Sequence, residues 1–321
     1  MKKQKSPTPL SGNGMVHRLF LATTMAMVAL LIWGCTSVAI YQGPIAKFQT
    51  SVNAANDGIR TYLLNVNTLI AEGNLYDKIA TGNTEDWKLR DVTSGIPDNL
   101  IQVRLKALTT IASYAQALSA LANSKGVEDL GQAAKSFGDN LDELTGTING
   151  IAKSKYSFDI GKPVASTVIL FGTLAVEHME KQALERGIIS GSTNVQNILQ
   201  ALKTDLATIG MVTDATESAI WDGKLVIYNK LRSKADPKEI DGLINQFLQD
   251  YNKVQTLKTL QVGSLLVDME DATQALVSFA RSSKSPKDIA ALADHIDVFA
   301  DHVKLFNNAL SSIQTGINSA K

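Results

Sequence analysis

The chain has 321 residues, with 31 basic and 31 acidic side chains, and aromatic residues make up only 6% of it. Binding to nucleic-acid phosphates needs an excess of basic residues on one face, so the balanced charge argues against a nucleic-acid partner. The single cysteine excludes an internal disulfide, and the seven prolines and few aromatic residues favour helices over a β-sandwich.

The first 34 residues have the parts of a secretory signal peptide. A basic head that ends at Arg18 is followed by an uncharged, largely apolar run, Leu19–Trp33, and then by the small residue Gly34. We therefore predict that residues 1–34 are a signal peptide, cleaved after Gly34. Without them, the chain carries four more acidic than basic side chains.

Cys35, the only cysteine, directly follows Gly34. The segment that ends at Cys35 resembles the lipobox of bacterial lipoproteins, although Ile32 and Trp33 depart from the usual leucine and small residue of that motif. The resemblance implies cleavage between Gly34 and Cys35 and acylation of Cys35, for example by palmitate. Acylation would also consume a lone thiol that an oxidising compartment would otherwise expose to reaction.

An alternative for the N-terminal segment is an uncleaved membrane anchor. No charged residue occurs in 19–42, and this stretch is long enough to span a bilayer with some tilt. Both alternatives place the basic end inside and the body of the protein outside the cytoplasm.

The lipobox resemblance also implies a location. In such lipoproteins an aspartate after the acylated cysteine often signals retention in the inner membrane, and this chain has Thr36 there. The expected location is therefore the outer membrane, with the body facing the periplasm and membrane lipid bound through acylated Cys35. We expect residues 35–43 to form a lipidated tether and residues 44–321 a helical bundle domain.

From Pro44 onward, apolar residues recur at alternating spacings of three and four, which is typical of one buried helix face. The predicted fold is all-α, an elongated up-and-down bundle with coiled-coil-like packing. One stripe comprises Ile45, Phe48, Val52, Ala55, Ile59, Tyr62, Val66 and Leu69, and another comprises Ile289, Leu292, Ile296, Phe299, Val303, Phe306, Leu310, Ile313 and Ile317. We expect about seven helices, near residues 44–72, 97–122, 127–153, 163–186, 193–233, 237–283 and 286–319.

Local signals mark the expected helix ends. Prolines such as Pro44 precede several of the periodic stretches, where proline is tolerated in the first turn. Capping boxes are expected at Asp236–Glu239, Ser285–Asp288 and Thr193–Gln196. The stripe of the sixth helix changes phase near residues 258–261, which predicts a kink or stutter there. Residues 73–96 are expected to be mainly loop.

His295 and His302 are the most suggestive side chains for a site, because their spacing of seven places them on one face. A metal site or a pH-sensitive patch would need such a pair. In the heptad register of this helix, however, both histidines lie beside the buried seam, which predicts a flanking surface instead. No nucleophile, phosphate-loop or dinucleotide motif occurs, so we expect no enzyme activity, cofactor or metal.

Residues 163–176 contain no charge, and two interpretations of them lead to different functions. A run of this length is more typical of a buried core helix, which predicts a membrane-tethered interaction or scaffold module with an envelope protein as partner. The alternative is a pore-forming or membrane-remodelling protein that inserts residues 163–176 into a bilayer.

Overall fold

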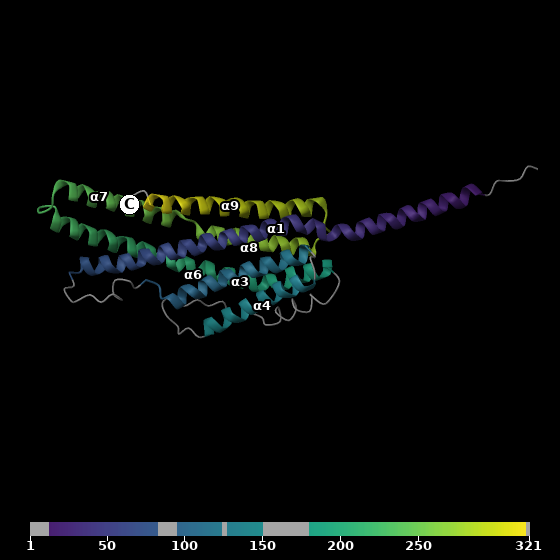
Figure 1. The fold of residues 1–321 in the computed structure, drawn as a ribbon, viewed down its shortest axis with the longest axis horizontal. Helices are drawn as coiled ribbons and strands as arrows, with labels where there is room; N and C mark the ends of the chain where they lie inside the picture. The colour runs from purple at the N-terminus through teal and green to yellow at the C-terminus, as the bar shows by residue number, and fades with distance from the viewer. Residues whose placement is uncertain (1–12, 83–94, 124–126, 150–179, 319–321) are drawn as a thin grey trace, which may run out of the picture.

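A computed structural model of the chain describes residues 13–82, 95–123, 127–149 and 180–318; for residues 13–37, 127–130, 149, 180 and 314–318 it describes the helix and not the side chains. These residues form seven helices and no strand. The helices run up and down in an elongated bundle, which confirms the predicted all-α fold (Figure 1). They are α1 (Asn13–Ala80), α3 (Asp98–Asn123), α4 (Val127–Asn149), α6 (Glu180–Leu231), α7 (Pro237–Thr259), α8 (Val262–Arg281) and α9 (Pro286–Asn318).

Helix α1 is central to the bundle. It packs against α3, α6 and α9, while α4 covers α3 and α8 lies against both α6 and α9. The N-terminal part of α1 extends past one end of the bundle, and the turn between α6 and α7 lies at the opposite end (Figure 1). The two ends of the molecule are therefore built from different helices.

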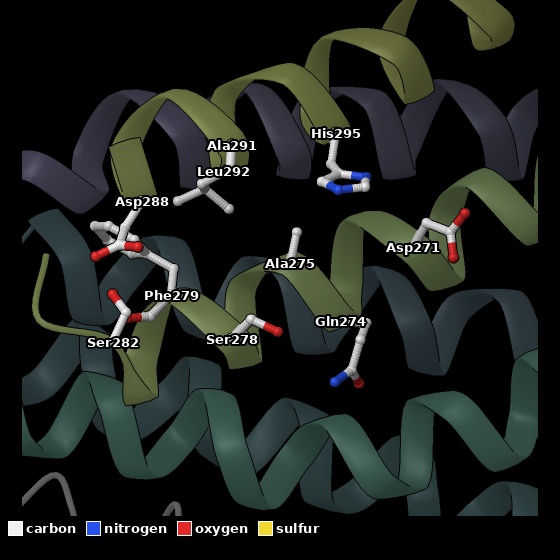
Figure 2. A pocket seen from close by; sticks show the side chains of 10 residues that line it. All are labelled: Asp271, Gln274, Ala275, Ser278, Phe279, Ser282, Asp288, Ala291, Leu292 and His295. Carbon is white, nitrogen blue, oxygen red and sulfur yellow. The ribbon is translucent and has the colours of Figure 1, made fainter. Parts of the chain in front are cut away.

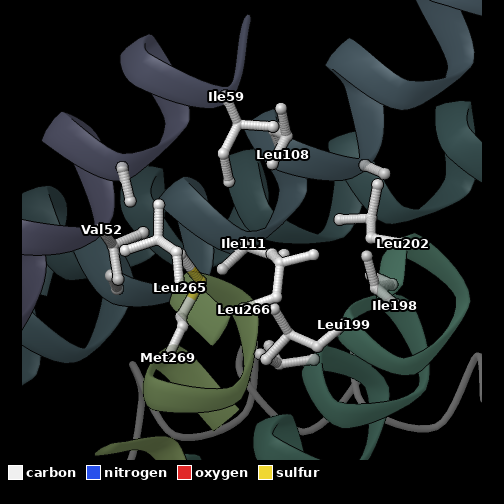
Figure 3. Packing of buried hydrophobic residues seen from close by; sticks show 14 of the residues in the cluster. Val52, Ile59, Leu108, Ile111, Ile198, Leu199, Leu202, Leu265, Leu266 and Met269 are labelled. Carbon is white, nitrogen blue, oxygen red and sulfur yellow. The ribbon is translucent and has the colours of Figure 1, made fainter. Parts of the chain in front are cut away.

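The predicted apolar stripes form the core. Every member of the α1 stripe is buried, as are the described members of the α9 stripe except Ile289, which is half-buried. Figure 3 shows how four helices meet there: Val52 and Ile59 of α1, Leu108 and Ile111 of α3, Ile198, Leu199 and Leu202 of α6, and Leu265, Leu266 and Met269 of α8. Burial of one such side chain contributes about 1.5–3 kcal/mol, so the stripes dominate the stability of the fold.

The first helix differs from the prediction at both ends. It starts at Asn13 rather than near Pro44, and Pro44 lies inside it. An interior proline removes one helical hydrogen bond and clashes with the preceding turn, but the buried Tyr41 and Ile45 hold the helix against the bundle on either side of it. Residues 35–43, which we expect to form the lipidated tether, lie within this helix.

At its other end α1 continues to Ala80, eight residues beyond the expected end. Gly73, which was expected to begin a loop, is instead a helix-contact residue. A Cβ atom at Gly73 would lie 2.3 Å from Cγ2 of Thr216, so the absence of a side chain lets α1 and α6 approach closely. Residues 83–94 of the expected loop lie outside the described part of the chain.

The predicted break between residues 186 and 193, which contains Gly191, is wrong, because α6 is one continuous helix from Glu180 to Leu231. The expected capping box at Thr193–Gln196 consequently lies in a helix interior. A glycine inside a helix costs about 1 kcal/mol relative to alanine, and the burial of Ile188 and Val195 on either side offsets that cost. Residues 163–179, including the uncharged segment 163–176, lie outside the described residues.

The predicted irregularity near residues 258–261 is confirmed as a break between two helices. Helix α7 ends at Thr259, Leu260 is extended, and α8 begins at Val262. The expected burial of the stripe before this break is only partly correct, because Val254 and Leu257 are buried in α7 whereas Ile244 and Tyr251 are exposed. Most of α7 therefore has one apolar face in contact with solvent.

Two of the predicted capping boxes are present. At the start of α7, the Asp236 carboxylate accepts a hydrogen bond from the backbone N–H of Lys238, and the Glu239 carboxylate accepts one from the N–H of Asp236. At the start of α9, the N–H of Ser285 donates to Asp288 Oδ2 at 2.9 Å, and the N–H of Asp288 donates to Ser285 Oγ at 3.3 Å. These bonds satisfy backbone donors that a helix start leaves unpaired.

The α9 capping box predicts a pH-dependent stability. Hydrogen bonds from Ser285 hold the pKa of Asp288 below its usual range. A depressed pKa in the folded state stabilises the protein above the unfolded-state pKa of about 3.9, and this contribution is lost as the pH falls through the folded-state pKa. We expect Asp288→Asn to lower the melting temperature at pH 7, and this difference from wild type to shrink below about pH 4. A difference that stays constant from pH 7 to pH 2 would contradict this role.

Candidate functional site

The residues predicted to carry the lipid lie in the N-terminal part of α1. Gly34 and Cys35 are within this helix, and their side chains lie outside the described part of the chain. Tyr41, which is fully buried, follows Cys35 by six residues, or about 9 Å along a helix axis. The core of the bundle therefore begins within two helical turns of the predicted acylation site.

A polar network anchors this end of the bundle. The hydroxyl of Tyr41 donates to Glu185 Oε1 at 3.0 Å, and its ring packs edge-on against Phe279 with the centroids 4.9 Å apart. Lys284 Nζ lies 3.2 Å from the same Glu185 oxygen. Burial, together with the negative charge of Glu185, raises the pKa of Tyr41 and keeps its hydroxyl protonated as the donor. These contacts connect α1, α6 and α8 close to Cys35.

Among the residues whose side chains the structure describes, no helix is both long enough and apolar enough to cross a membrane. The apolar run that ends at Trp33 lies outside this set of residues.

His295 borders a shallow pocket of about 220 Å³ between α8 and α9 (Figure 2). Asp271 and Asp288 lie at opposite ends of this pocket in Figure 2, so the two carboxylates do not converge on the imidazole. The pocket floor is formed by Ala275, Leu292 and their neighbours. The arrangement provides a weakly polar surface groove between two helices.

His302 lies further along α9, and its Nδ1 is within hydrogen-bonding distance of a carboxylate oxygen of Asp268 of α8. It borders a second hollow of about 280 Å³ beside Leu305 and Phe306. Both histidines are exposed at the α8–α9 flank, as their heptad positions predicted. The described residues contain no group of three or more His, Cys, Asp or Glu side chains that could hold a metal ion.

Sequence reasoning missed a buried ion pair between α3 and α6. Arg104 Nε donates to Asp205 Oδ2 at 2.7 Å, and Arg104 Nη2 donates to Oδ1 at 2.5 Å. Arg104 Nη1 also donates to the carbonyl oxygen of Leu100 at 2.6 Å. Burial raises the pKa of Asp205, and the hydrogen bonds and charge of Arg104 oppose that rise. The sequence does contain one signal for its burial: Arg104 lies three residues after Ile101 and four before Leu108, which places it on the buried face of α3.

Lys224 of α6 is a second buried cation that the apolar pattern of the sequence did not predict. Its ammonium forms an ion pair with Asp250 of α7. It also lies 4.8 Å from the ring centroid of Phe247, 5.4 Å from that of Trp221 and 5.5 Å from that of Tyr76. A lysine enclosed by aromatic faces gains from cation–π attraction. This cluster therefore attaches α7 to α1 and α6, and the lysine itself fills the aromatic cage.

A third hollow, of about 370 Å³, lies between α1 and α3. Asn56 at its edge donates to the carbonyl oxygen of Leu108 at 2.7 Å. Within the described part of the chain, Asn56 Oδ1 is the buried side-chain atom that lacks a hydrogen-bond partner. A single free acceptor in an open hollow does not define a catalytic arrangement.

No protein-family model matches this chain, and comparisons with curated proteins and with solved structures give no match either.

Proposed function

We propose that this protein is a bacterial envelope lipoprotein, anchored through acylated Cys35, and that its helical body is a non-catalytic interaction or scaffold module. The observation that carries the proposal is the position of the only cysteine, directly after Gly34 at the end of a basic head and an apolar run. The cleaved and acylated chain would begin at Cys35 and, because residue 36 is threonine, would face the periplasm from the outer membrane.

The packing of the bundle supports the scaffold part of the proposal. Two cations, Arg104 and Lys224, are buried in the described helices, and each forms an ion pair with a carboxylate of a neighbouring helix. Such groups serve to hold helices together rather than to act on a bound molecule. A long bundle of this kind offers side surfaces to an envelope protein partner.

The geometry of α1 determines how such a module would sit at a membrane. Helix α1 is continuous from residues 35–43 into the core, so Cys35 and the first core residue, Tyr41, belong to one rigid element. An acyl group on Cys35 would therefore hold the α1 end of the bundle near the lipid surface. The opposite end, where α6 turns into α7, would be free to meet other molecules.

The lipoprotein proposal is tested by Cys35→Ser in cells that carry the full chain. We expect the variant to lose labelling by a fatty-acid analogue and to keep its signal peptide, because both steps need the cysteine. Thr36→Ser is the matched control and should label and mature as the wild type does. A Cys35→Ser protein that labels and fractionates like the wild type would exclude lipidation at this residue.

A further inference from the structure

The free end of the bundle is a two-helix hairpin whose two sides differ. We define the hairpin as residues 214–255, the end of α6 and most of α7. One side faces α1: a Cβ atom at Gly223 would lie 2.5 Å from the carbonyl oxygen of Tyr76, and Lys253 Nζ lies 3.7 Å from a carboxylate oxygen of Glu72. This side of the hairpin is therefore covered within the molecule.

The other side of the hairpin carries large apolar side chains in contact with solvent. Leu225 of α6 is 54% exposed, and Ile244, Leu248 and Tyr251 of α7 are 40%, 57% and 46% exposed. The three α7 residues are spaced by four and three, so they form one stripe. Trp221 of α6 joins the two helices on this side, because its ring centroid lies 5.6 Å from that of Tyr251.

We call the exposed residues Leu225, Ile244, Leu248 and Tyr251, together with the half-buried Trp221 beside Tyr251, the hairpin patch. Contiguous apolar patches on a soluble surface are typical of interaction sites. The hairpin has the layout of half a four-helix bundle, with one side packed and one side open.

The charges at the two ends of the patch are opposite. Along α6, Asp214 precedes Trp221 by seven residues. Arg232 follows Leu225 by seven residues; it is the first residue after the end of α6, and its backbone N–H still donates to the carbonyl oxygen of Tyr228 at 2.9 Å, so it continues the last helical turn. Because seven residues are close to two helical turns, both charged residues lie on the same face as the patch. Both are exposed, and 18 residues, or about 27 Å along the helix axis, separate them. Asp214 shares Lys258 with Glu217, so two carboxylates and one ammonium leave this end of the patch with a net negative charge.

We propose that a second copy of this chain covers the hairpin patch, with the two hairpins packed antiparallel around a twofold axis near Leu225 and Leu248. In a twofold interface the same surface of each copy is used, so residue i contacts residue j and j contacts i. An antiparallel arrangement places Asp214 of each copy opposite Arg232 of the other. A parallel arrangement would place like charges together, and such repulsion across an interface disfavours it.

The charge pattern favours a second copy over an unrelated partner, because the patch is complementary to itself. The resulting contact would be a four-helix bundle built from two α6–α7 hairpins, with the exposed leucines as its core. The two α1 N-termini would then point in opposite directions. If both copies are anchored through Cys35 in one membrane, the bundles would lie along its surface; this consequence alone depends on the proposed lipid anchor.

The first test measures the mass of the full chain in detergent solution by sedimentation velocity over a range of concentrations. The wild type is expected to shift from monomer to dimer as its concentration rises. Leu248→Asp, at the centre of the patch, is expected to abolish the dimer. Leu305→Asp is the matched control, because Leu305 of α9 is 65% exposed and outside the patch, and this variant should dimerise as the wild type does.

The second test reverses the two charges. Asp214→Arg and Arg232→Asp should each weaken dimerisation by about tenfold or more, and the double variant should return to within about threefold of wild type, because the charge pairs are restored in reversed order. Asp214 also pairs with Lys258 at 2.9 Å within one chain, so thermal melting is measured for each variant to confirm an intact fold.

The outcomes are decisive in both directions. A wild type that stays monomeric, a dimer that survives Leu248→Asp, or a double reversal that binds as weakly as either single reversal would overturn the proposal. Weaker dimerisation of both single variants, together with near wild-type dimerisation of the double variant, would establish the antiparallel contact. Neither result depends on acylation of Cys35, so failure here is distinguishable from failure of the proposed lipid anchor.

Discussion

Replacing Arg104 with alanine is expected to lower the free energy of unfolding by about 3–5 kcal/mol, because it leaves the carboxylate of Asp205 buried without its partner. In the folded protein Arg104 makes two hydrogen bonds to Asp205 and one to the carbonyl oxygen of Leu100. Removal of the guanidinium takes this hydrogen-bond donor away from the buried carboxylate of Asp205 and from the carbonyl oxygen of Leu100. Urea denaturation of the wild type and the variant would measure the loss.

The matched double variant separates the ion pair from the packing around it. Arg104→Met combined with Asp205→Leu replaces both charges with apolar side chains, which often restores or exceeds the original stability of a buried pair. We expect the double variant to recover most of the loss. Lys106→Ala serves as the surface control: Lys106 pairs with Glu143 at the surface, and the loss of such a pair should cost less than about 1 kcal/mol. Similar losses for Arg104→Ala and Lys106→Ala would contradict the buried role of Arg104.

Phe299→Ala is expected to destabilise the bundle by about 3–5 kcal/mol, as truncation of a buried aromatic side chain does. Phe299 is fully buried on the α9 stripe, and its ring centroid lies 6.3 Å from that of Phe48 on α1. The substitution would leave a cavity between these two helices.

Asp301→Ala is the control for this register, because Asp301 is exposed two positions further along the same helix. It should change the free energy of unfolding by less than about 0.5 kcal/mol. Equal shifts in melting temperature for the two variants would contradict the heptad register of α9, and with it the placement of His295 and His302 on the flank.

Several features of this protein were predictable because they depend on neighbours along the chain. The stripes of α1 and α9 are buried as their three-and-four spacing indicated. The capping boxes at Asp236 and Ser285 are formed by residues two or three positions apart. The break before Val262 follows from a change in the phase of the apolar pattern. The interpretation of Gly34 and Cys35 also rests on sequence alone, since their side chains lie outside the described part of the chain.

Other features were decided only when distant segments packed together. Pro44 and Gly191 are local signals of helix ends, yet α1 and α6 run through them, because burial against other helices is worth more than one lost hydrogen bond or one flexible residue. Arg104 and Lys224 would be surface cations on isolated helices. Their partners, Asp205 and Asp250, lie 101 and 26 residues away.

The exposed face of α7 has the same cause. Its stripe predicts burial, but in the folded chain α1 covers only the other side of the α6–α7 hairpin. Periodicity determines which face of a helix is apolar, whereas the tertiary arrangement determines whether another helix is present to cover it.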